Sequence, residues 1–493
     1  MDDFLAHKYS VEFNIPIELA LLISKRFPDY EIARDFLFPN RSQLKNPAEL
    51  PDITRGVNNI LEAIKKEKNI LIYAHDDPDG YTSAVILHQT LCEIRRRDRP
   101  EIFIYPINRE KDGYLLNPEV LKEYQTKGVK VLITVDFGIS NPRNFFVAQE
   151  LGLDLIICDH HETELNDFPV PAIDPKRRDS NYPFRELAGA GVTLKLSQFL
   201  YRAALGVTDD EFLRLKKELV VIAMIGTLAD RVMPLNENRV LCYEGLKMFN
   251  EVNKPWTRYF LDRYPITIPQ IFNEIIPLLQ AAALKDSRLG VDFFLNSDFK
   301  GVVEELKKVE IQRRENIEYL FSMALDVAKV YPNVVIAVIP GNALAPEQFK
   351  MNNLGAVVSK LRDHFHRTAI GIIAKDKKCF AELRSHDINL FDFLNNARSL
   401  FIDYGGHKRA SGFSMHEDNL DRFIEYATRA IPESNTEKTH LVPEITLDKS
   451  RIKLLEPLLP FGEGNPSPLL TDGIDLYTID NRMNIIELGV WRT

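Results

Sequence analysis

The sequence predicts an α/β protein built on a doubly wound, mostly parallel sheet, joined by a long helix to a second, smaller α/β domain. Continuous apolar runs of strand length alternate with segments whose apolar residues recur at helical spacing, as in a parallel sheet covered by helices on both faces. The chain has 493 residues, and a prior of roughly 150 residues per domain gives about three domains. We therefore expect several domains, with the parallel sheet in the first half of the chain.

Four strands are expected in that first half. NILIYA is an uninterrupted apolar run, followed by the turn-like sequence HDDPDG and by TSAVILHQTLCEI, which is apolar at helical spacing. After the third strand, Ser140, Asn141 and Pro142 fit a helix cap with proline in the first turn. The expected strands cover residues 69–74, 101–107, 129–136 and 153–159.

In the second half of the chain, the pattern changes first to mostly helical and then back to alternating strands and helices. Residues 186–330 are largely helical, and the stretch 304–330 predicts a long helix that bridges two domains. Strand-like runs return at 333–339 and 369–374, before a Gly-rich segment and the polar linker PESNTEK. The expected parts are a helical lead-in (1–57), the sheet domain (58–248), a helical connector (249–331), a second α/β domain (332–432) and a short β segment (440–493).

The composition is that of a folded protein and excludes several classes. The formal net charge is −9 and 45% of the residues are hydrophobic, which excludes a disordered chain. Four scattered cysteines without a CxxC pair predict reduced thiols. No apolar run approaches the roughly 18 residues that a membrane span needs, so we expect a cytoplasmic protein that does not enter a membrane. The basic clusters at 95–97, 176–178, 313–314 and 408–409 are expected to be solvated faces.

Polar side chains follow three of the four expected strands at the points where those strands end. Because the carboxyl ends of parallel strands meet at one edge of a sheet, these side chains should converge on a ligand crevice. A single Asp at a strand end is commonly a helix cap and a single His is usually structural, but the joint placement indicates a metal site. The residues are His75, Asp76, Asp77 and Asp79 after the first strand, Asp136 after the third, and Asp159, His160 and His161 after the fourth.

Converging carboxylates repel one another unless cations or protons neutralise them. Two divalent ions about 3.5–4 Å apart remove that repulsion and catalyse displacement at phosphorus. Carboxylate and imidazole donors without a thiolate favour Mn²⁺ over Mg²⁺ or Zn²⁺. The pattern therefore predicts a hydrolase of phosphate esters that uses two divalent ions, Mn²⁺ by preference and Mg²⁺ as the alternative.

The ordered set of motifs resembles the DHH phosphoesterase superfamily. HDDPDG (75–80), VDFGIS (135–140), DHH (159–161) and Asp230 in IGTLAD match its four motifs in order. The resemblance narrows to the RecJ family of single-strand-specific exonucleases through FLFPNRSQLKNPAELPD, AGAGVTLKL, YGGHKRASGF and FGEGNPSP. The last of these resembles the motif that leads a nucleic-acid-binding OB-fold, so residues 440–493 are expected to form a partial or truncated OB-fold.

The resemblance implies a role for each matching residue. His75 and Asp77 would hold one ion, Asp79, His160 and Asp230 would hold the other, and Asp136 would bridge them. His161 would lie beside the scissile phosphate, with Asp159 orienting an imidazole. Asp76 falls at the variable position of its motif and is left out. In the second domain the matching substrate contacts are Arg384, Ser385, Gly405, Gly406, His407 and Lys408.

The implied function is a metal-dependent exonuclease that degrades single-stranded DNA, running 5′→3′ to mononucleotides, in DNA repair and recombination. One alternative is a nano-RNase or 3′-phosphoadenosine 5′-phosphate phosphatase that acts on short oligonucleotides with the same metals. Another is an archaeal-type RecJ-like protein of replication that is both nuclease and scaffold. A third is a catalytically inactive replication scaffold like the RecJ-related subunits of eukaryotic replicative helicases. Single-stranded nucleic acid is the expected partner, with a single-strand-binding protein or other replication and repair proteins beside it.

Overall fold

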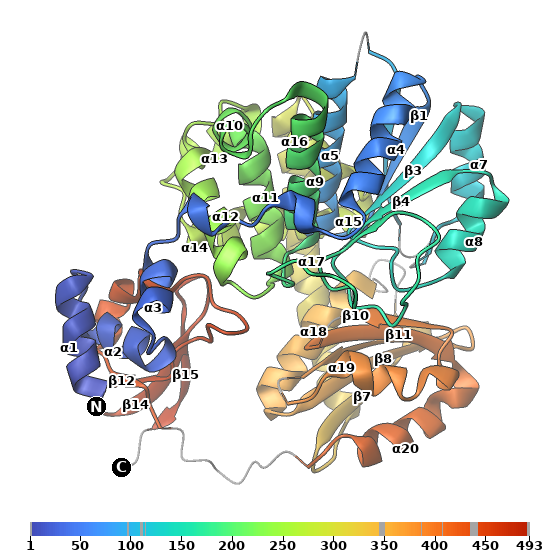
Figure 1. Cartoon of the computed structure of the whole chain (residues 1–493). Coiled ribbons are helices and arrows are strands. Elements are labelled where there is room, and N and C mark those ends of the chain that lie inside the picture. Colours follow the sequence, from blue (N-terminus) through green and yellow to red (C-terminus); the bar gives the residue numbers. More distant parts are fainter. Residues whose placement is uncertain are drawn as a thin grey trace.

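The computed structural model describes residues 2–490 apart from 96–97, 109–111, 114, 345–350, 386, 407 and 434–441. The described chain forms two α/β units and a third unit in which N-terminal helices pack against C-terminal strands (Figure 1). None of the described helices combines the length and the apolar character that crossing a bilayer requires.

The first sheet has five parallel strands in the order β2-β1-β3-β4-β5. The chain therefore adds β2 on one side of β1 and then returns to add β3 on the other, which confirms the predicted doubly wound sheet. The four expected strands are observed to within one residue at each end, and the two-residue β5 was not expected. The strands are β1 (Asn69–Ala74), β2 (Ile102–Pro106), β3 (Val129–Val135), β4 (Asp154–Cys158) and β5 (Ala172–Ile173).

Both faces of this sheet are buried, which explains why its strands are apolar without interruption. Alternate residues of β1 face opposite cores: Ile70 and Ile72 pack toward α4 (Ile53–Lys65), α5 (Pro78–Ile94) and α9 (Gly189–Leu205). Leu71 and Tyr73 instead join the core formed with α7 (Pro118–Thr126) and α8 (Arg143–Glu150).

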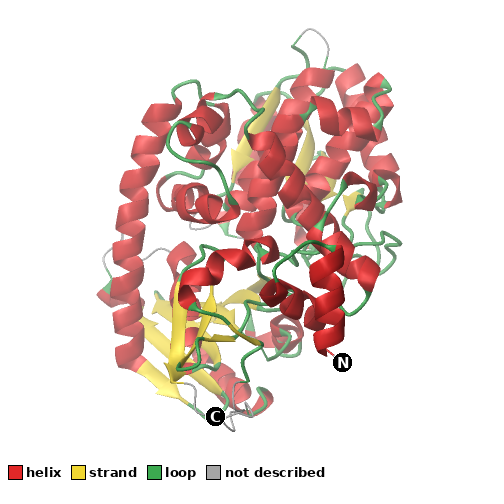
Figure 2. Cartoon of the chain, turned by 90° about the vertical axis from the view of Figure 1, so that its left-hand side faces the viewer, coloured by secondary structure: helices red, strands yellow, loops and turns green. Residues whose placement is uncertain are grey.

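A helical region follows the sheet and ends in a long helix. Helix α17 (Phe299–Val327) has 29 residues, which corresponds to about 44 Å at 1.5 Å per residue, and it leads directly into the second sheet (Figure 2). The other helices of the region are α10 (Asp209–Leu215), α11 (Lys217–Asp230), α12 (Asn236–Phe249), α13 (Pro255–Leu261), α14 (Ile268–Gln270), the π-helical turn η3 (Ile271–Ile275), α15 (Ile276–Lys285) and α16 (Arg288–Leu295).

The second sheet has six strands in the order β10-β11-β9-β8-β7-β6, of which only β7 and β8 pair in parallel. Helix α18 (Met351–Phe365) and the end of α17 cover one face, and α19 (Leu390–Asn395) and α20 (Leu420–Ala430) cover the other. The strands are β6 (Ala328–Val330), β7 (Val334–Pro340), β8 (Thr368–Lys375), β9 (Lys378–Arg384), β10 (Asp403–Gly406) and β11 (Ala410–His416).

The third unit joins segments from the two ends of the described chain. Arg26, on α2, donates hydrogen bonds to Glu444, Asn465 and Pro466 across more than 400 residues. Its sheet runs in the order β12-β13-β14-β15. The elements are α1 (Asp2–Glu12), α2 (Ile17–Arg26), α3 (Tyr30–Leu37), β12 (Ile445–Thr446), the 3₁₀ segment η7 (Lys449–Leu458), β13 (Leu470–Thr471), β14 (Asp475–Ile479) and β15 (Ile485–Val490).

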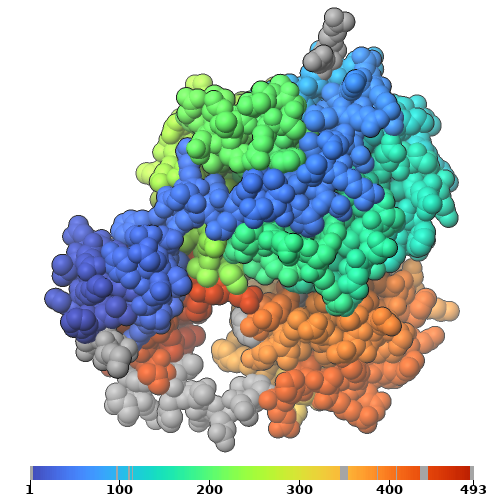
Figure 3. Space-filling model, viewed as in Figure 1, coloured from blue at the N-terminus to red at the C-terminus, as the bar shows by residue number. Residues whose placement is uncertain are grey.

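The three units surround an opening in the molecule. The space-filling view shows the third unit and the second unit on either side of this opening, with the first unit above both (Figure 3). The second and third units also approach each other, since Nζ of Lys408 lies 3.6 Å from Oε1 of Glu463. The turn that contains Glu463 is therefore close to a residue of the second unit, Lys408, that was expected to bind substrate.

Candidate active site

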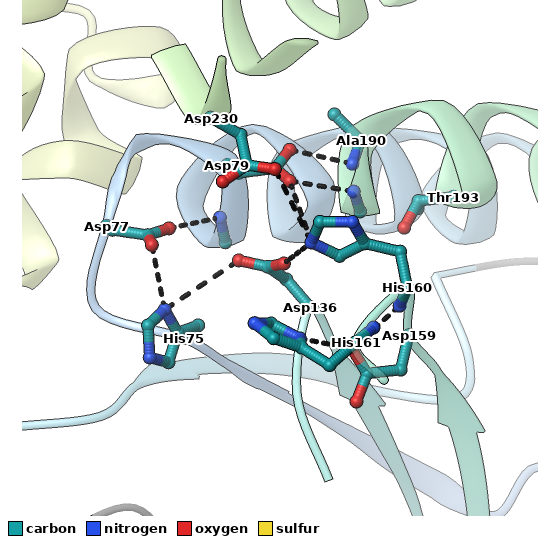
Figure 4. A network of polar contacts seen from close by, with 12 residues as sticks. His75, Asp77, Asp79, Asp136, Asp159, His160, His161, Ala190, Thr193 and Asp230 are labelled. Carbon is teal, nitrogen blue, oxygen red and sulfur yellow. Dashed lines mark hydrogen bonds and ion pairs between the residues drawn. The ribbon is translucent and has the colours of Figure 1, made fainter. Parts of the chain in front are cut away.

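The carboxyl edge of the first sheet gathers the acidic and imidazole side chains (Figure 4). His75 follows β1, Asp79 lies in the first turn of α5, Asp136 follows β3, and His160 follows β4. A fifth side chain arrives from outside the sheet, because Asp230 is the last residue of α11. Residues from four separate segments thus line one crevice.

These side chains form two groups, and Asp136 lies between them. In one group, Nδ1 of His75 lies 2.9 Å from Oδ2 of Asp77 and 3.8 Å from Oδ2 of Asp136. In the other, Nε2 of His160 lies 3.1 Å from Oδ1 of Asp136, and 3.7 Å and 3.6 Å from Oδ2 of Asp79 and Asp230. The two oxygens of Asp136 therefore face different groups.

Backbone N–H groups hold two of the carboxylates in place. Asp79 accepts hydrogen bonds from the backbone nitrogens of Gly189 (2.7 Å) and Ala190 (2.8 Å), at the start of α9. Asp77 caps α5 by accepting from the backbone nitrogen of Gly80 at 2.9 Å. The positive ends of two helix dipoles thus support the negative charge of these side chains.

Asp136 has an unusual backbone conformation. Its φ is +62°, in the left-handed region that few residues other than glycine adopt, and its nitrogen donates to the carbonyl of Cys158 at 2.9 Å. Strain of this kind persists where the surroundings enforce it and is concentrated at functional sites. A methyl group at Gly189 would lie 2.6 Å from Oδ1 of Asp136, so only glycine fits against this carboxylate.

Asp159 orients His161. Its Oδ1 lies 2.7 Å from Nδ1 of His161 and also accepts from the backbone nitrogen of His160 at 2.7 Å, while Oδ2 accepts from that of Ile139 at 3.0 Å. The other ring nitrogen of His161 is then the one that faces the crevice, and a third group places His161 with Asp136 and His160. An imidazole fixed in this way can donate to a negatively charged ligand.

The buried carboxylates of the crevice are stable in their charged form only if positive charge lies close to them. Burial raises the pKa of Asp79 and of Asp136 well above the usual range, and neighbouring carboxylates raise both further. Burial and then Asp77 raise the pKa of Asp230 to about 6. Among the described residues, Oδ2 of Asp136 and Oδ2 of Asp230 are buried and accept no hydrogen bond. These carboxylates fit divalent cations, which would neutralise their charge and occupy the unused oxygens.

Two histidines respond to the same surroundings in opposite ways. Burial lowers the pKa of His160 well below its usual value, and the positive charge of His161 lowers it further, which keeps the ring neutral as a metal ligand must be. Burial also acts to lower the pKa of His161, but Asp159 outweighs it and raises that pKa. His161 is thus the more readily protonated of the pair.

The residues of the second domain that were predicted to contact substrate differ in exposure and in hydrogen bonding. Arg384 donates to Oε2 of Glu382 at 2.8 Å, and Lys408 is half exposed. A methyl group at Gly405 would meet nothing within 4 Å, so the backbone is open there, whereas Gly406 has a φ of +129°. Ser385 is fully buried, and its hydroxyl bonds Thr368 at 2.7 Å, which fits a structural turn better than a substrate contact. His407 lies outside the described residues.

Five arginines from four parts of the chain act electrostatically on one another, and Arg231 among them follows the crevice residue Asp230. Arg231 reaches solvent, yet surrounding protein lowers its pKa, and the positive charges of Arg482, Arg384 and Arg362 lower it further. Burial likewise lowers the pKa of Arg313, on α17, and Arg482 and Arg231 add to that effect. Such a concentration of guanidinium groups fits a polyanion.

The basic cluster at 176–178 is not the solvated face that the sequence predicted. Lys176 and Arg177 are buried, with Arg177 donating to Asp52 (2.6 Å) and Asp179, while Arg178 is exposed. Nζ of Lys176 lies 3.6 Å from Glu162 and 3.5 Å from Glu186. That prediction was wrong because both side chains pair with carboxylates, Lys176 with Glu162 and Glu186, and Arg177 with Asp52 and Asp179.

Two family descriptions match the chain. The DHH family N-terminal domain matches residues 69–227, and the DHHA1 domain matches residues 332–433. The first covers the parallel sheet with its strand-end carboxylates, and the second covers the six-stranded sheet. The chain is therefore a DHH-family protein with a DHHA1 domain.

Similar proteins narrow this assignment to the RecJ type. The Bacillus subtilis (strain 168) single-stranded-DNA-specific exonuclease RecJ is 29% identical, over 92% of this chain and 58% of the relative. The corresponding Escherichia coli (strain K12) protein is 27% identical, over 85% of this chain and 78% of the relative. The chain thus spans less than two thirds of the Bacillus subtilis protein.

A solved structure supports the fold over the whole chain. The crystal structure of RecJ from Thermus thermophilus in complex with Mn²⁺ superimposes with a TM-score of 0.74 at 22% identity, covering 99% of this chain and 72% of that one. The likeness extends beyond the two matched domains to the third unit. Beyond its DHH and DHHA1 domains, the chain is similar over most of its length to exonucleases of the RecJ type.

Proposed function

We propose that this protein is a metal-dependent exonuclease of the RecJ type, which hydrolyses phosphodiester bonds of single-stranded DNA. The observation that carries the proposal is the pair of ligand groups with Asp136 between them, one oxygen toward His75 and the other toward His160. Two divalent ions bound there would activate a water molecule and stabilise the charge that develops on the phosphoryl group.

The residues of the chain have separate tasks in this proposal. His75 and Asp77 hold one ion, Asp79, His160 and Asp230 hold the other, and Asp136 serves both. His161 donates to a phosphate oxygen, since Asp159 fixes its ring and raises its pKa. We propose Mn²⁺ as the preferred ion and Mg²⁺ as the alternative, because the donors are oxygens and imidazoles.

The five arginines support a single-stranded nucleic acid as the substrate. Contacts to phosphates fix the position of a strand without reading its sequence, and Arg384 is the proposed contact in the second domain. We also propose that the strand runs 5′→3′ through the site and that the role lies in repair and recombination. The proposed compartment is the cytoplasm, where the four free cysteines would remain reduced. Single-strand-binding and other replication proteins remain predicted partners.

The decisive experiment is a Mn²⁺ time course on single-stranded DNA that carries a label at one end or the other. We expect a labelled mononucleotide at once from the 5′-labelled strand, gradual shortening of the 3′-labelled strand, and no cleavage of duplex. The reverse order of products would contradict the 5′→3′ direction. Cleavage of dinucleotides alone would replace the proposal with the nano-RNase alternative.

Arg384→Ala tests the proposed phosphate contact. We expect weaker substrate binding and a salt slope reduced by about one, because one phosphate contact is lost. Arg429→Ala is the matched control, since Arg429 is exposed on α20 of the same domain and pairs only with its helix neighbour Glu425 among the contacts described. Identical salt slopes for the two variants would show that Arg384 does not bind phosphate.

A further inference from the structure

The turn formed by residues 461–465, in the third unit, packs against the segment that follows Asp230. A methyl group at Gly462 would lie 2.8 Å from Cδ of Pro234, and one at Gly464 would lie 2.8 Å from Cδ1 of Leu235. Phe461 borders a small cavity together with Arg231 and Val232. The turn therefore packs against Pro234 and Leu235, in the segment that follows Asp230.

This turn is held rigidly within its own unit. Asn465 is fully buried, and its Nδ2 donates to the carbonyls of Leu458 (2.6 Å) and Pro460 (2.8 Å). The backbones of Gly462 and Asn465 bond each other in both directions, at 2.9 Å and 3.1 Å. Because every buried polar group of Asn465 has a hydrogen-bond partner, the turn keeps one conformation and can hold a neighbouring segment in place.

A second anchor ties the same segment to the helix that follows Asp230. Arg239, on α12, is buried and donates to the carbonyls of Leu459 (3.0 Å) and Pro457 (2.6 Å) while its guanidinium lies over the ring of Phe36. Residues 457–459, which precede the turn, are thus hydrogen-bonded to the first unit, and the turn itself contacts Pro234 of that unit.

Asp136 and Asp230 are held differently from the other carboxylates of the site. Asp77, Asp79 and Asp159 each accept a backbone N–H, whereas Oδ2 of Asp136 and Oδ2 of Asp230 accept no hydrogen bond from the described residues. Asp136 still lies between two strand ends of the sheet, but Asp230 lies at the end of a helix. Its helix ends there, and Arg231 adopts a left-handed φ of +59°. The position of this carboxylate therefore depends on how the backbone after it is held.

We propose that the 461–465 turn is a positioning element for Asp230, through which the third unit sets the geometry of one ligand group. This inference rests on the proposed function. It predicts that disturbing the turn weakens the ion held by Asp79, His160 and Asp230 and leaves the ion held by His75, Asp77 and Asp136 in place. The turn itself need not touch the nucleic acid.

Two glycine variants of the full-length protein test the proposal. Gly464→Ala and Gly473→Ala both place a side chain at a positive φ (+78° and +97°) in the third unit, but only Gly464 faces Leu235, while Gly473 has open space around it. The measurement is equilibrium binding of Mn²⁺, with free ion counted by electron paramagnetic resonance. We expect two ions in the wild-type and Gly473→Ala proteins. In Gly464→Ala we expect one of them to bind about 10–100-fold more weakly, as when a supporting contact is lost.

Activity provides an independent readout. With Gly464→Ala, kcat should fall at limiting Mn²⁺ and recover at excess Mn²⁺, while KM for the oligonucleotide stays unchanged. Gly462→Ala should show the same pattern without backbone strain, because its new methyl group pushes only on Pro234. Mn²⁺ affinities equal to those of Gly473→Ala in both variants would overturn the positioning role alone. A wild-type protein that binds no Mn²⁺ would overturn the proposed function as well.

Discussion

At the scale of single residues, Asp136 combines a strained backbone with a carboxylate that faces both ligand groups. We predict that Asp136→Asn lowers kcat by more than about 100-fold, since loss of even an outer partner of a metal ligand costs about 10–100-fold. Asp174→Asn is the matched control: Asp174 is a buried carboxyl that follows β5 at the same sheet edge and belongs to no ligand group among the described residues. Steady-state kinetics check this, and comparable activity of the two variants would refute the shared ligand.

The pairing of Asp159 with His161 makes a prediction about pH. Burial lowers the pKa of His161 but Asp159 raises it above the usual value, so the protonated ring persists to higher pH than it otherwise would. Asp159→Asn removes that effect, and the alkaline limb of the kcat profile should move to lower pH. An unmoved alkaline limb would show that protonated His161 does not support the reaction.

Sequence reasoning identified the site residues at strand ends because a strand end is a local feature. His75, Asp136 and His160 each follow an apolar run that can be recognised without knowing the rest of the fold. Asp230 ends a helix, and only the resemblance to a family selected it. The burial of Lys176 could not be predicted either, because its partner Glu162 lies before β5 and Lys176 lies after it.

At the scale of elements, the start of α9 supports two carboxylates at once. Its first backbone nitrogens hold Asp79, and Gly189 leaves room for Asp136. We predict that Gly189→Ala weakens Mn²⁺ binding by about 10–100-fold, because the new methyl group would lie 2.6 Å from Oδ1 of Asp136. Mn²⁺ titration monitored by calorimetry measures this.

Gly191→Ala, two residues further along the same helix, is the control for that change. Its new methyl group would meet Leu187 at 3.3 Å and no carboxylate. Both substitutions raise helix propensity by the same amount, so equal Mn²⁺ affinities in the two variants would contradict the role given to Gly189.

Elements with a long apolar run were predictable, and short ones were not. The four main strands of the first sheet follow from their own sequences. The two-residue β5 exists because it can pair with β4, so its two residues carry too little pattern to reveal it. The long helix was expected over 304–330, but it begins at Phe299 and ends at Val327, where β6 begins.

At the scale of the whole molecule, metal binding and folding stability should be linked through pH. The pKa values of Asp79, Asp136 and Asp230 are raised in the fold, so without metal the folded state binds protons more tightly than the unfolded chain. The stability that these groups contribute is therefore lost as pH rises through their raised pKa values, and the pKa of Asp230 is about 6. Bound Mn²⁺ should restore the stability that is lost at higher pH. At lower pH, protons should compete with Mn²⁺ for the carboxylates.

We predict that Mn²⁺ at about 100 times its Kd raises Tm by about 5–10 °C at pH 7.5. At pH 5 the increase should be clearly smaller. Differential scanning calorimetry with and without Mn²⁺ at both pH values measures the effect. An increase that is the same at both pH values would contradict the carboxylate ligand set.

The third unit was the part of the fold that the sequence revealed least. Its strands were expected as a separate C-terminal segment and its helices as a separate N-terminal lead-in. The structure joins them, with Arg26 bound to Glu444 and Glu18 to Arg451. No local pattern marks a contact between segments so far apart.

That arrangement has a consequence for synthesis on the ribosome. Arg26 and Glu444 are separated by 418 residues, which at about 5–20 residues per second take roughly 20–80 s to translate. Throughout that time the face of α2 that later covers the C-terminal strands has no partner from its own unit. A nascent chain with an exposed apolar helix is a substrate for chaperones, so the yield of this protein should depend on translation speed more than that of a chain whose units are contiguous.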